Sequence, residues 1–147
     1  MPRLVDAEID TSALLRAVVR PECGAAILFV GTTRQFTDGY ETASLDYEAY
    51  HDMALAEMAR LEQEACDRFE IAQCLIEHRL GNVPIGETSV AVAVSSPHRK
   101  AAFAAAEWVM DQLKARVPIW KKDRSPTGER WVPNSKPENE SDKLNAR

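Results

Sequence analysis

Hydrophobic residues recur at helical and strand spacings along the chain, and these spacings predict where helices and strands lie. Residues 10–20 have the pattern of a short amphipathic helix capped by Asp10 or Thr11. Apolar positions three and four apart predict a long amphipathic helix over about residues 52–68. A third helix should start at Ser96-Pro97, with serine as the cap and proline in the first position. Its expected buried stripe consists of Ala102, Phe103, Ala106, Val109, Met110 and Leu113.

Four segments have strand patterns. Residues 23–31 form a continuous apolar run, which predicts a strand covered on both faces. Residues 44–50 alternate as a half-exposed strand does. Further strands are expected at residues 71–80 and 88–95, a mobile loop at 32–42, a turn at 83–86 and a C-terminal hairpin around the turn at 125–128.

Helices and strands alternate without a regular βαβ repeat, so the predicted fold class is α+β. We expect a mixed, mostly antiparallel sheet with packed helices, in a single domain that ends in the hairpin. The 147 residues suit one domain, which we assign to residues 1–133. Residues 134–147 are poor in apolar side chains and are expected to be a disordered tail.

The composition narrows the class of protein and its partners. Hydrophobic residues make up 45% and charged residues 28%, as in soluble globular proteins. The absence of a long apolar run and of an N-terminal signal core predicts a cytoplasmic protein with no membrane contact. Three cysteines without CxxC spacing and three scattered histidines predict no metal site. A net charge of −5 without a basic stripe argues against a nucleic-acid partner.

The most distinctive local feature is a basic segment at residues 114–124, which carries five cationic side chains. Pro118 ends the preceding helix, so Lys114 lies before the break and Lys121 lies after it. Such local basicity in an acidic protein suggests an anionic ligand or an acidic chain terminus. The alternative is a solvated charged turn.

Two further basic positions could contribute to an anion site. Arg34 follows the apolar strand at residues 23–31, although on its own it could be an ordinary surface arginine. His98 and Arg99 occupy a helix start, where free N–H groups and the helix dipole already favour an anion. Cations oppose the dipole there, so their placement indicates either a phosphate or carboxylate site or an ordinary helix start.

Five segments occur in order along nearly the whole chain, from about residue 5 to residue 133. They are Phe29-Val-Gly-Thr-Thr-Arg34, Leu45-Asp-Tyr-Glu-Ala-Tyr50, His78-Arg-Leu-Gly81, Val94-Ser-Ser-Pro-His-Arg-Lys-Ala-Ala-Phe103 and Lys114-Ala-Arg-Val-Pro-Ile-Trp-Lys121. Together they resemble the large, catalytic subunit of molybdopterin synthase. The loop beginning Gln35-Phe-Thr-Asp-Gly-Tyr departs from that family's usual Arg-Asn or Arg-Asp continuation.

The resemblance implies a sulfurtransferase that converts cyclic pyranopterin monophosphate to molybdopterin by installing two sulfurs. The sulfur would come from the C-terminal Gly-Gly thiocarboxylate of a small ubiquitin-like partner subunit, with no cofactor and no sulfur-carrying cysteine of the chain's own. Lys114 would stabilise the oxyanion of acyl transfer, Lys121 would move protons, and His98 would shuttle protons near the pterin. The implied site residues are Lys114 and Lys121 for catalysis, and Arg34, His98, Arg99, Phe29 and Met110 for substrate binding.

One consequence concerns assembly. His98 and Lys114 are sixteen residues apart on one expected helix, or ~24 Å at ~1.5 Å rise per residue. A pterin phosphate cannot span that distance, so we expect a homodimer. Its shared site would combine Lys114, Lys121 and Arg34 of one chain with His98 and Arg99 of the other. The alternatives are a non-catalytic module that binds a ubiquitin-like tail and a regulatory domain that senses a phosphorylated metabolite.

Overall fold

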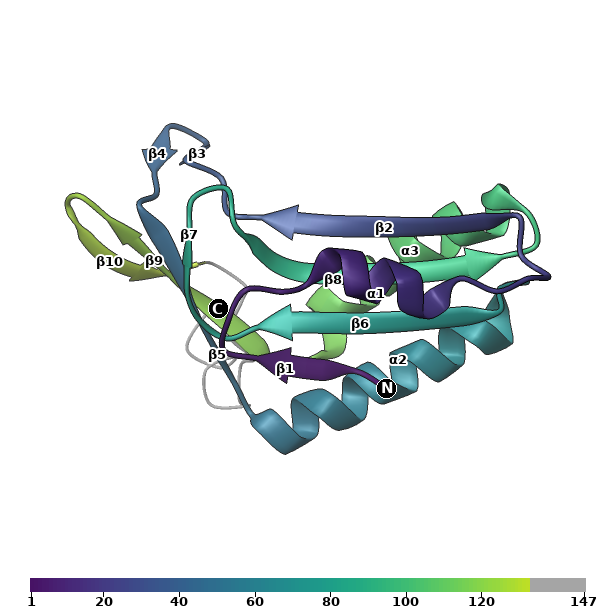
Figure 1. Ribbon diagram of the computed structural model, residues 1–147. Coiled ribbons are helices and arrows are strands. Elements are labelled where there is room, and N and C mark those ends of the chain that lie inside the picture. The colour runs from purple at the N-terminus through teal and green to yellow at the C-terminus, as the bar shows by residue number, and fades with distance from the viewer. Residues whose placement is uncertain (133–147) are drawn as a thin grey trace.

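Three helices pack on a four-stranded sheet, and a second four-stranded sheet lies at one end of the molecule (Figure 1). The computed structural model describes residues 1–132. Its helices are α1 (Thr11–Val18), α2 (His51–Arg68) and α3 (Arg99–Arg116). Its strands are β1 (Arg3–Val5), β2 (Ala25–Thr32), β3 (Phe36–Thr37), β4 (Tyr40–Glu41), β5 (Ser44–Ala49), β6 (Gln73–Arg79), β7 (Gly81–Pro84), β8 (Thr88–Ser96), β9 (Ile119–Ser125) and β10 (Gly128–Trp131).

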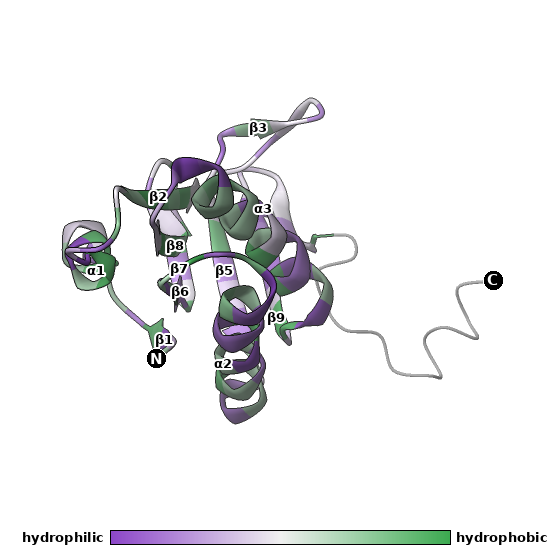
Figure 2. Cartoon of the chain, turned by 90° about the vertical axis from the view of Figure 1, so that its right-hand side faces the viewer, coloured by the Kyte–Doolittle hydropathy of each residue, from purple (hydrophilic) through white to green (hydrophobic). Residues whose placement is uncertain are grey.

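The main sheet has the order β1-β6-β8-β2, with β1 parallel to β6 and the other pairs antiparallel. Figure 2 shows α1 on one side of these strands and α2 and α3 on the other. Alternate residues of β8 serve the two faces, because side chains point alternately up and down along a strand. Val90, Val92 and Val94 pack with α2 and α3, whereas Ala91 and Ala93 pack with α1.

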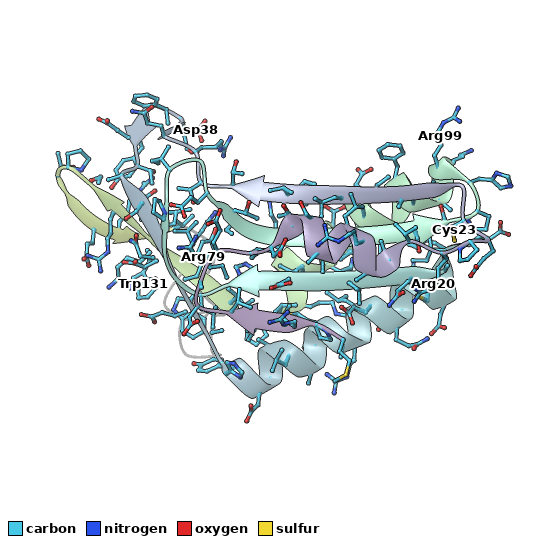
Figure 3. All side chains as sticks on the ribbon, viewed as in Figure 1. Arg20, Cys23, Asp38, Arg79, Arg99 and Trp131 are labelled. Carbon is cyan, nitrogen blue, oxygen red and sulfur yellow. The ribbon has the colours of Figure 1, made fainter. Side chains whose placement is uncertain are left out.

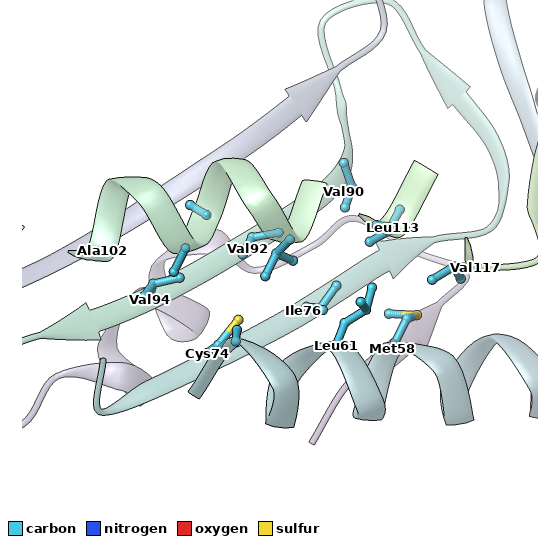
Figure 4. Close-up of a cluster of buried hydrophobic side chains, with 14 of the residues drawn as sticks. Met58, Leu61, Cys74, Ile76, Val90, Val92, Val94, Ala102, Leu113 and Val117 are labelled. Atoms are coloured by element: carbon cyan, nitrogen blue, oxygen red, sulfur yellow. The ribbon is translucent and has the colours of Figure 1, made fainter. Parts of the chain in front are cut away.

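The larger core fills the space between the main sheet and the two long helices (Figure 4). Met58 and Leu61 of α2 meet Ile76 of β6, and Val109 and Leu113 of α3 complete the layer. Each of these side chains is at least 95% buried. Burial of one such side chain contributes roughly 1.5–3 kcal/mol, so this layer holds α2 and α3 against the main sheet.

The second sheet has the order β10-β9-β5-β7, and all of its neighbours are antiparallel. The chain enters it from the main sheet at Gly81, whose φ of 82° is in the left-handed region that glycine adopts freely. It enters this sheet earlier at β5, after the β3–β4 hairpin, and once more after α3, where Val117 is already extended and Pro118 prevents a further helical turn. The C-terminal end of α3 therefore leads directly into β9.

The structure confirms much of the sequence prediction, including the α+β class and the C-terminal hairpin formed by β9 and β10. Asp10 caps α1, since its carboxylate accepts a hydrogen bond from the N–H of Ala13 at 3.0 Å. The long helix and the alternating strand are present as α2 and β5. The predicted tail at residues 134–147 lies outside the described residues.

Two predictions about α3 were wrong. The helix begins at Arg99 with His98 as its N-cap, because β8 continues through the fully buried Ser96. Ser96 donates to the carbonyl of His98 instead of capping the helix. Phe103 was expected in the buried stripe but is 61% exposed. The helix packs instead through alanines, including Ala102 and Ala105, on the face turned away from Phe103.

Other segments also differ from prediction. The expected loop at residues 32–42 contains the β3–β4 hairpin, with Asp38 and Gly39 at positive φ in the turn. Part of the predicted turn at residues 83–86 belongs to β7, which pairs with β5. The apolar strand β2 is at the edge of the main sheet, so it is only partly covered. The N-terminal strand β1 has too short an apolar pattern to be predicted.

Candidate active site

Cationic side chains gather where α3 passes into the second sheet. Lys114 is exposed in the last turn of α3, and Lys121 is partly buried on β9. Burial lowers the pKa of Lys121, and the charges of Lys114 and Arg34 lower that pKa further. The structure thus brings Arg34 to Lys114 and Lys121, which are distant from it in sequence.

Arg34 reaches this place because the segment after β2 is held by its backbone. The N–H of Thr33 donates to the carbonyl of Glu87 at 3.2 Å, and the N–H of Gly86 donates to the carbonyl of Thr33 at 3.0 Å. Gly31 is required just before this turn, because a Cβ there would lie 2.7 Å from Cγ1 of Val90. These contacts fix the end of β2, from which Arg34 extends.

Asp123 is a buried carboxylate of this site that the sequence did not reveal. It is 5% exposed, and its Oδ2 accepts a hydrogen bond from the hydroxyl of Thr42 at 2.8 Å. Within the described chain its Oδ1 has no hydrogen-bond partner. Asp123 is the charge that raises the pKa of Lys121, against the effects of burial and the two cations. It thereby limits how far the lysine amine becomes a neutral base.

His78 and Tyr47 form a buried aromatic pair beside Lys121. Their ring centroids are 4.9 Å apart in an edge-to-face arrangement. Tyr47 is the Cα partner of Lys121 in the β5–β9 ladder. Burial, with a smaller contribution from the charge of Lys121, lowers the pKa of His78 to about 4. The imidazole is therefore neutral at pH 7.

His98 and Arg99 lie at the other end of α3. They line an exposed pocket together with Gly24, Ala25, Pro97 and Lys100. Figure 3 shows Arg99 near Cys23 at one end of the molecule, while Arg79, Asp38 and Trp131 lie at the opposite end. With α3 continuous from Arg99 to Arg116, His98 and Lys114 are ~24 Å apart along the axis. One chain therefore does not bring the two predicted basic groups together.

The two remaining predicted residues lie between these ends. Phe29 is in the middle of the edge strand β2 and is 39% exposed. Met110 is partly buried against the core, one turn of α3 before Lys114. Neither contributes a charge, so both can only line a surface or pocket wall.

The other cations of the basic segment pair with carboxylates. Arg116 contacts Glu64 at 2.7 Å and Glu57 at 3.4 Å, which ties the end of α3 to α2. Lys122 pairs with Glu129 at 3.4 Å. Arg124 pairs with Asp46 and Glu129. These three cations serve the fold, which separates them from Lys114 and Lys121.

The surroundings of Cys66 and Cys74 do not favour thiol chemistry, and the geometry of residues 1–132 indicates no protein-bound metal. Burial raises the pKa of Cys66 and of Cys74, so their thiolates are disfavoured. The described part of the chain has no cluster of three His, Cys, Asp or Glu side chains that could hold a metal ion. None of its helices is long and apolar enough to cross a membrane.

Comparison with known proteins defines the class. The family model described as "MoaE protein" matches residues 4–116, and the chain belongs to that family. The curated "Molybdopterin synthase catalytic subunit" of Bacillus subtilis (strain 168) is 42% identical over 139 residues, which is 88% of each chain. These findings confirm the resemblance that the sequence motifs indicate.

Solved structures agree with this assignment. The crystal structure of molybdopterin synthase from Staphylococcus aureus superposes with a TM-score of 0.84 at 36% identity, over 88% of this chain and 94% of that one. A protein–protein complex of subunits 1 and 2 of molybdopterin-converting factor from Helicobacter pylori 26695 has a TM-score of 0.77. At 22% identity, with 97% of each chain covered, that complex shares the fold.

Proposed function

We propose that this chain is the catalytic subunit of a molybdopterin synthase, which converts cyclic pyranopterin monophosphate to molybdopterin. The sulfur donor is the C-terminal Gly-Gly thiocarboxylate of a small ubiquitin-like subunit. The observation that carries this proposal is the convergence of Lys114, Lys121 and Arg34 at the end of α3. It occurs in a chain 42% identical to a molybdopterin synthase catalytic subunit.

The two lysines have different roles because their surroundings differ. Lys114 is exposed at the end of α3, which suits its ammonium to the tail carboxylate and to the oxyanion that forms during acyl transfer. Lys121 is partly buried and its pKa is lowered, so it can give and take a proton closer to neutral pH. Arg34 adds a planar donor for the substrate phosphate or for the tail.

The second half of the site comes from another copy of the chain. Arg99, Phe103, Met110 and Lys114 fall on one face of α3, since ~100° per residue places them within roughly 60° of one another. Phe103 is exposed between the charged ends, and Phe29 is partly exposed on neighbouring β2. An antiparallel, twofold pairing of these faces buries the phenylalanines.

Such a pairing also sets Arg99 and His98 of one copy beside Lys114 of the other. Each dimer then has two complete sites. In each site, Arg99 and His98 hold the substrate phosphate while the lysines act at the thiocarboxylate. With one sulfur-carrier subunit per site, the assembly is a heterotetramer. The pterin substrate is a small soluble metabolite, and we place the reaction in the cytoplasm.

The test is reconstitution with purified components. The chain is mixed with cyclic pyranopterin monophosphate and a carrier ending in Gly-Gly thiocarboxylate, and molybdopterin is measured. Product should form only with the thiocarboxylate and not with a carrier ending in plain carboxylate. Binding of both carriers without any product would instead make the chain a docking module, and would overturn the proposal.

A further inference from the structure

His78 is buried beside Lys121, yet the chemistry above gives it no task. It is 4% exposed, at the end of β6, just before the Gly81 bend that leads into the second sheet. A buried imidazole is costly to place unless its polar atoms are used. Its two ring nitrogens therefore decide what it does.

The tautomer of His78 follows from its contacts. Nδ1 is 2.8 Å from the backbone carbonyl of Arg79, which can only accept, so Nδ1 carries the proton and donates it. Burial keeps the pKa of His78 at about 4, so the ring holds one proton at neutral pH. Nε2 is then unprotonated and acts as a hydrogen-bond acceptor.

The neighbouring hydroxyl of Tyr47 is engaged elsewhere. Tyr47 is hydrogen-bonded to Ser89, whose own hydroxyl donates to the carbonyl of Gly31 at 3.2 Å. Tyr47 therefore holds the imidazole by its ring edge, 4.9 Å between centroids, rather than through its hydroxyl. This leaves Nε2 of His78 available to another donor.

Lys121 is a donor that the sheet brings to the same side as His78. It is directly opposite Tyr47 in the β5–β9 ladder, and its charge acts on the His78 ring. We propose that His78 is a positioning residue for Lys121, in which the neutral Nε2 accepts a hydrogen bond from the lysine ammonium and fixes the direction of Nζ. This inference rests on the proposed proton-transfer role of Lys121.

Within residues 1–132, groups that face Lys121 come from four elements and one connecting segment. They are Lys114 on α3, Arg34 after β2, Tyr47 on β5, His78 on β6 and Asp123 on β9. Among these groups Asp123, His78 and the hydroxyl oxygen of Tyr47 can accept a hydrogen bond from an ammonium. Because an acceptor favours the charged lysine, loss of the His78 acceptor should lower the pKa of Lys121 further.

Two substitutions of His78 distinguish the roles of its two ring nitrogens. In His78→Asn the side-chain amide can replace the Nδ1–H bond to the Arg79 carbonyl but does not reach the Nε2 position. In His78→Gln the amide oxygen takes the place of Nε2. We expect kcat of His78→Asn to fall roughly 10- to 100-fold with little change in KM, since a small displacement of a catalytic group has this effect. The pH–rate profile of His78→Asn should also shift to lower pH. In His78→Gln, both kcat and the pH–rate profile should return most of the way to those of the wild type.

A direct test needs no turnover. In ¹⁵N imidazole NMR of the full chain, Lys121→Met should move the Nε2 resonance of His78 and raise its pKa above about 4. Lys122→Met is the matched control, because that lysine pairs with Glu129 at 3.4 Å on the opposite face of β9, and should leave the resonance in place.

The outcomes separate this inference from the proposed function. The positioning role would be overturned if the Nε2 resonance of His78 were unchanged in Lys121→Met. It would also be overturned if His78→Asn had the kcat and pH–rate profile of the wild type. If kcat fell equally in His78→Asn and His78→Gln and the pH–rate profile did not shift, His78 would be a packing residue. That result would also overturn the positioning role. Normal turnover in Lys121→Met would refute the catalytic role of the lysine, whatever the NMR result.

Discussion

The ammonium of Lys114, in the last turn of α3, lowers the pKa of Lys121 on β9 across the break made by Pro118. The two lysines are seven positions apart and belong to a helix and a strand in different layers of the molecule. A proline-terminated helix that runs straight into a strand is what brings both amines to one place. The remaining cations of the same segment point into ion pairs with α2 and the second sheet.

The first prediction concerns shared sites. Lys114→Ala and Arg99→Ala should each abolish product formation as pure proteins. When the two are unfolded together and refolded, half of the dimers should be mixed, and each mixed dimer should contain one intact site. We expect about a quarter of wild-type activity to return. No recovery, with mixed dimers demonstrated by native mass spectrometry, would place the whole site within one chain.

Lys114 and Arg116 should separate activity from stability. Lys114→Ala removes an exposed cation that makes no ion pair or side-chain hydrogen bond within residues 1–132, so it should eliminate turnover and leave the unfolding midpoint nearly unchanged. Arg116→Ala removes the contacts to Glu64 and Glu57, so it should lower the midpoint and leave kcat intact. Turnover and thermal unfolding of both variants check this. Near-normal turnover of Lys114→Ala would remove it from the catalytic residues.

Two buried groups should give opposite pH dependences of stability. Burial raises the pKa of Glu62 from 4.5 to about 7, so this group stabilises the fold below pH 4.5 and that stability is lost as pH rises to 7. Burial lowers the pKa of His78 from 6.5 to about 4, so its contribution is present above pH 6.5 and is lost as pH falls to 4. In the native chain the two effects largely cancel between pH 4.5 and 6.5.

Substitution should expose each effect. In the native chain the N–H of Ile76 donates to Oε2 of Glu62 at 2.8 Å, and Glu62→Gln keeps an acceptor there. Because only the contribution of His78 then remains, the stability of this variant should rise with pH between 4 and 6.5. His78→Gln should make stability fall between pH 4.5 and 7. Either change spans up to roughly 3 kcal/mol, measured by urea unfolding at several pH values. If the free energy of unfolding had the same pH dependence in the wild type and in Glu62→Gln, the raised pKa of Glu62 would be contradicted.

Gly31 should be sensitive to any side chain. Gly31→Ala places a Cβ 2.7 Å from Cγ1 of Val90, so β2 must move away from β8 at the point where it leads to Arg34. We expect a loss of about 1–3 kcal/mol in the free energy of unfolding and a reduced kcat. Ala26→Val, on an exposed position of the same strand, serves as the control and should be neutral.

Periodicity identified the elements that carry most of the site. The sequence predicts three of these features: the helix over residues 52–68, the strand β8 and the end of α3 before Pro118. Each of them depends on local spacing and backbone chemistry. The start of α3 was misplaced because tertiary burial keeps Ser96 in the strand, against the local capping preference of Ser-Pro.

The neighbours of Lys121 could not be found in the same way. Tyr47, His78 and Asp123 lie on three strands, and only the register of β5 with β9 and the bend at Gly81 set them side by side. A local pattern shows which face of a strand is buried, but not which distant strand it pairs with or at which residue. A signal did exist for Asp123, an acid among five cations, but its burial with Thr42 appears only in the folded chain.

The unbroken course of α3 also restricts which changes of length the chain tolerates. One residue inserted between Arg99 and Lys114 turns one end about 100° relative to the other and adds ~1.5 Å. Such an insertion takes one basic end off the face that holds the other, and it also disturbs the alanines that pack on the main sheet. Insertions are therefore expected at the β3–β4 turn or the β9–β10 turn, while the number of residues in α3 stays constant among relatives that share this site.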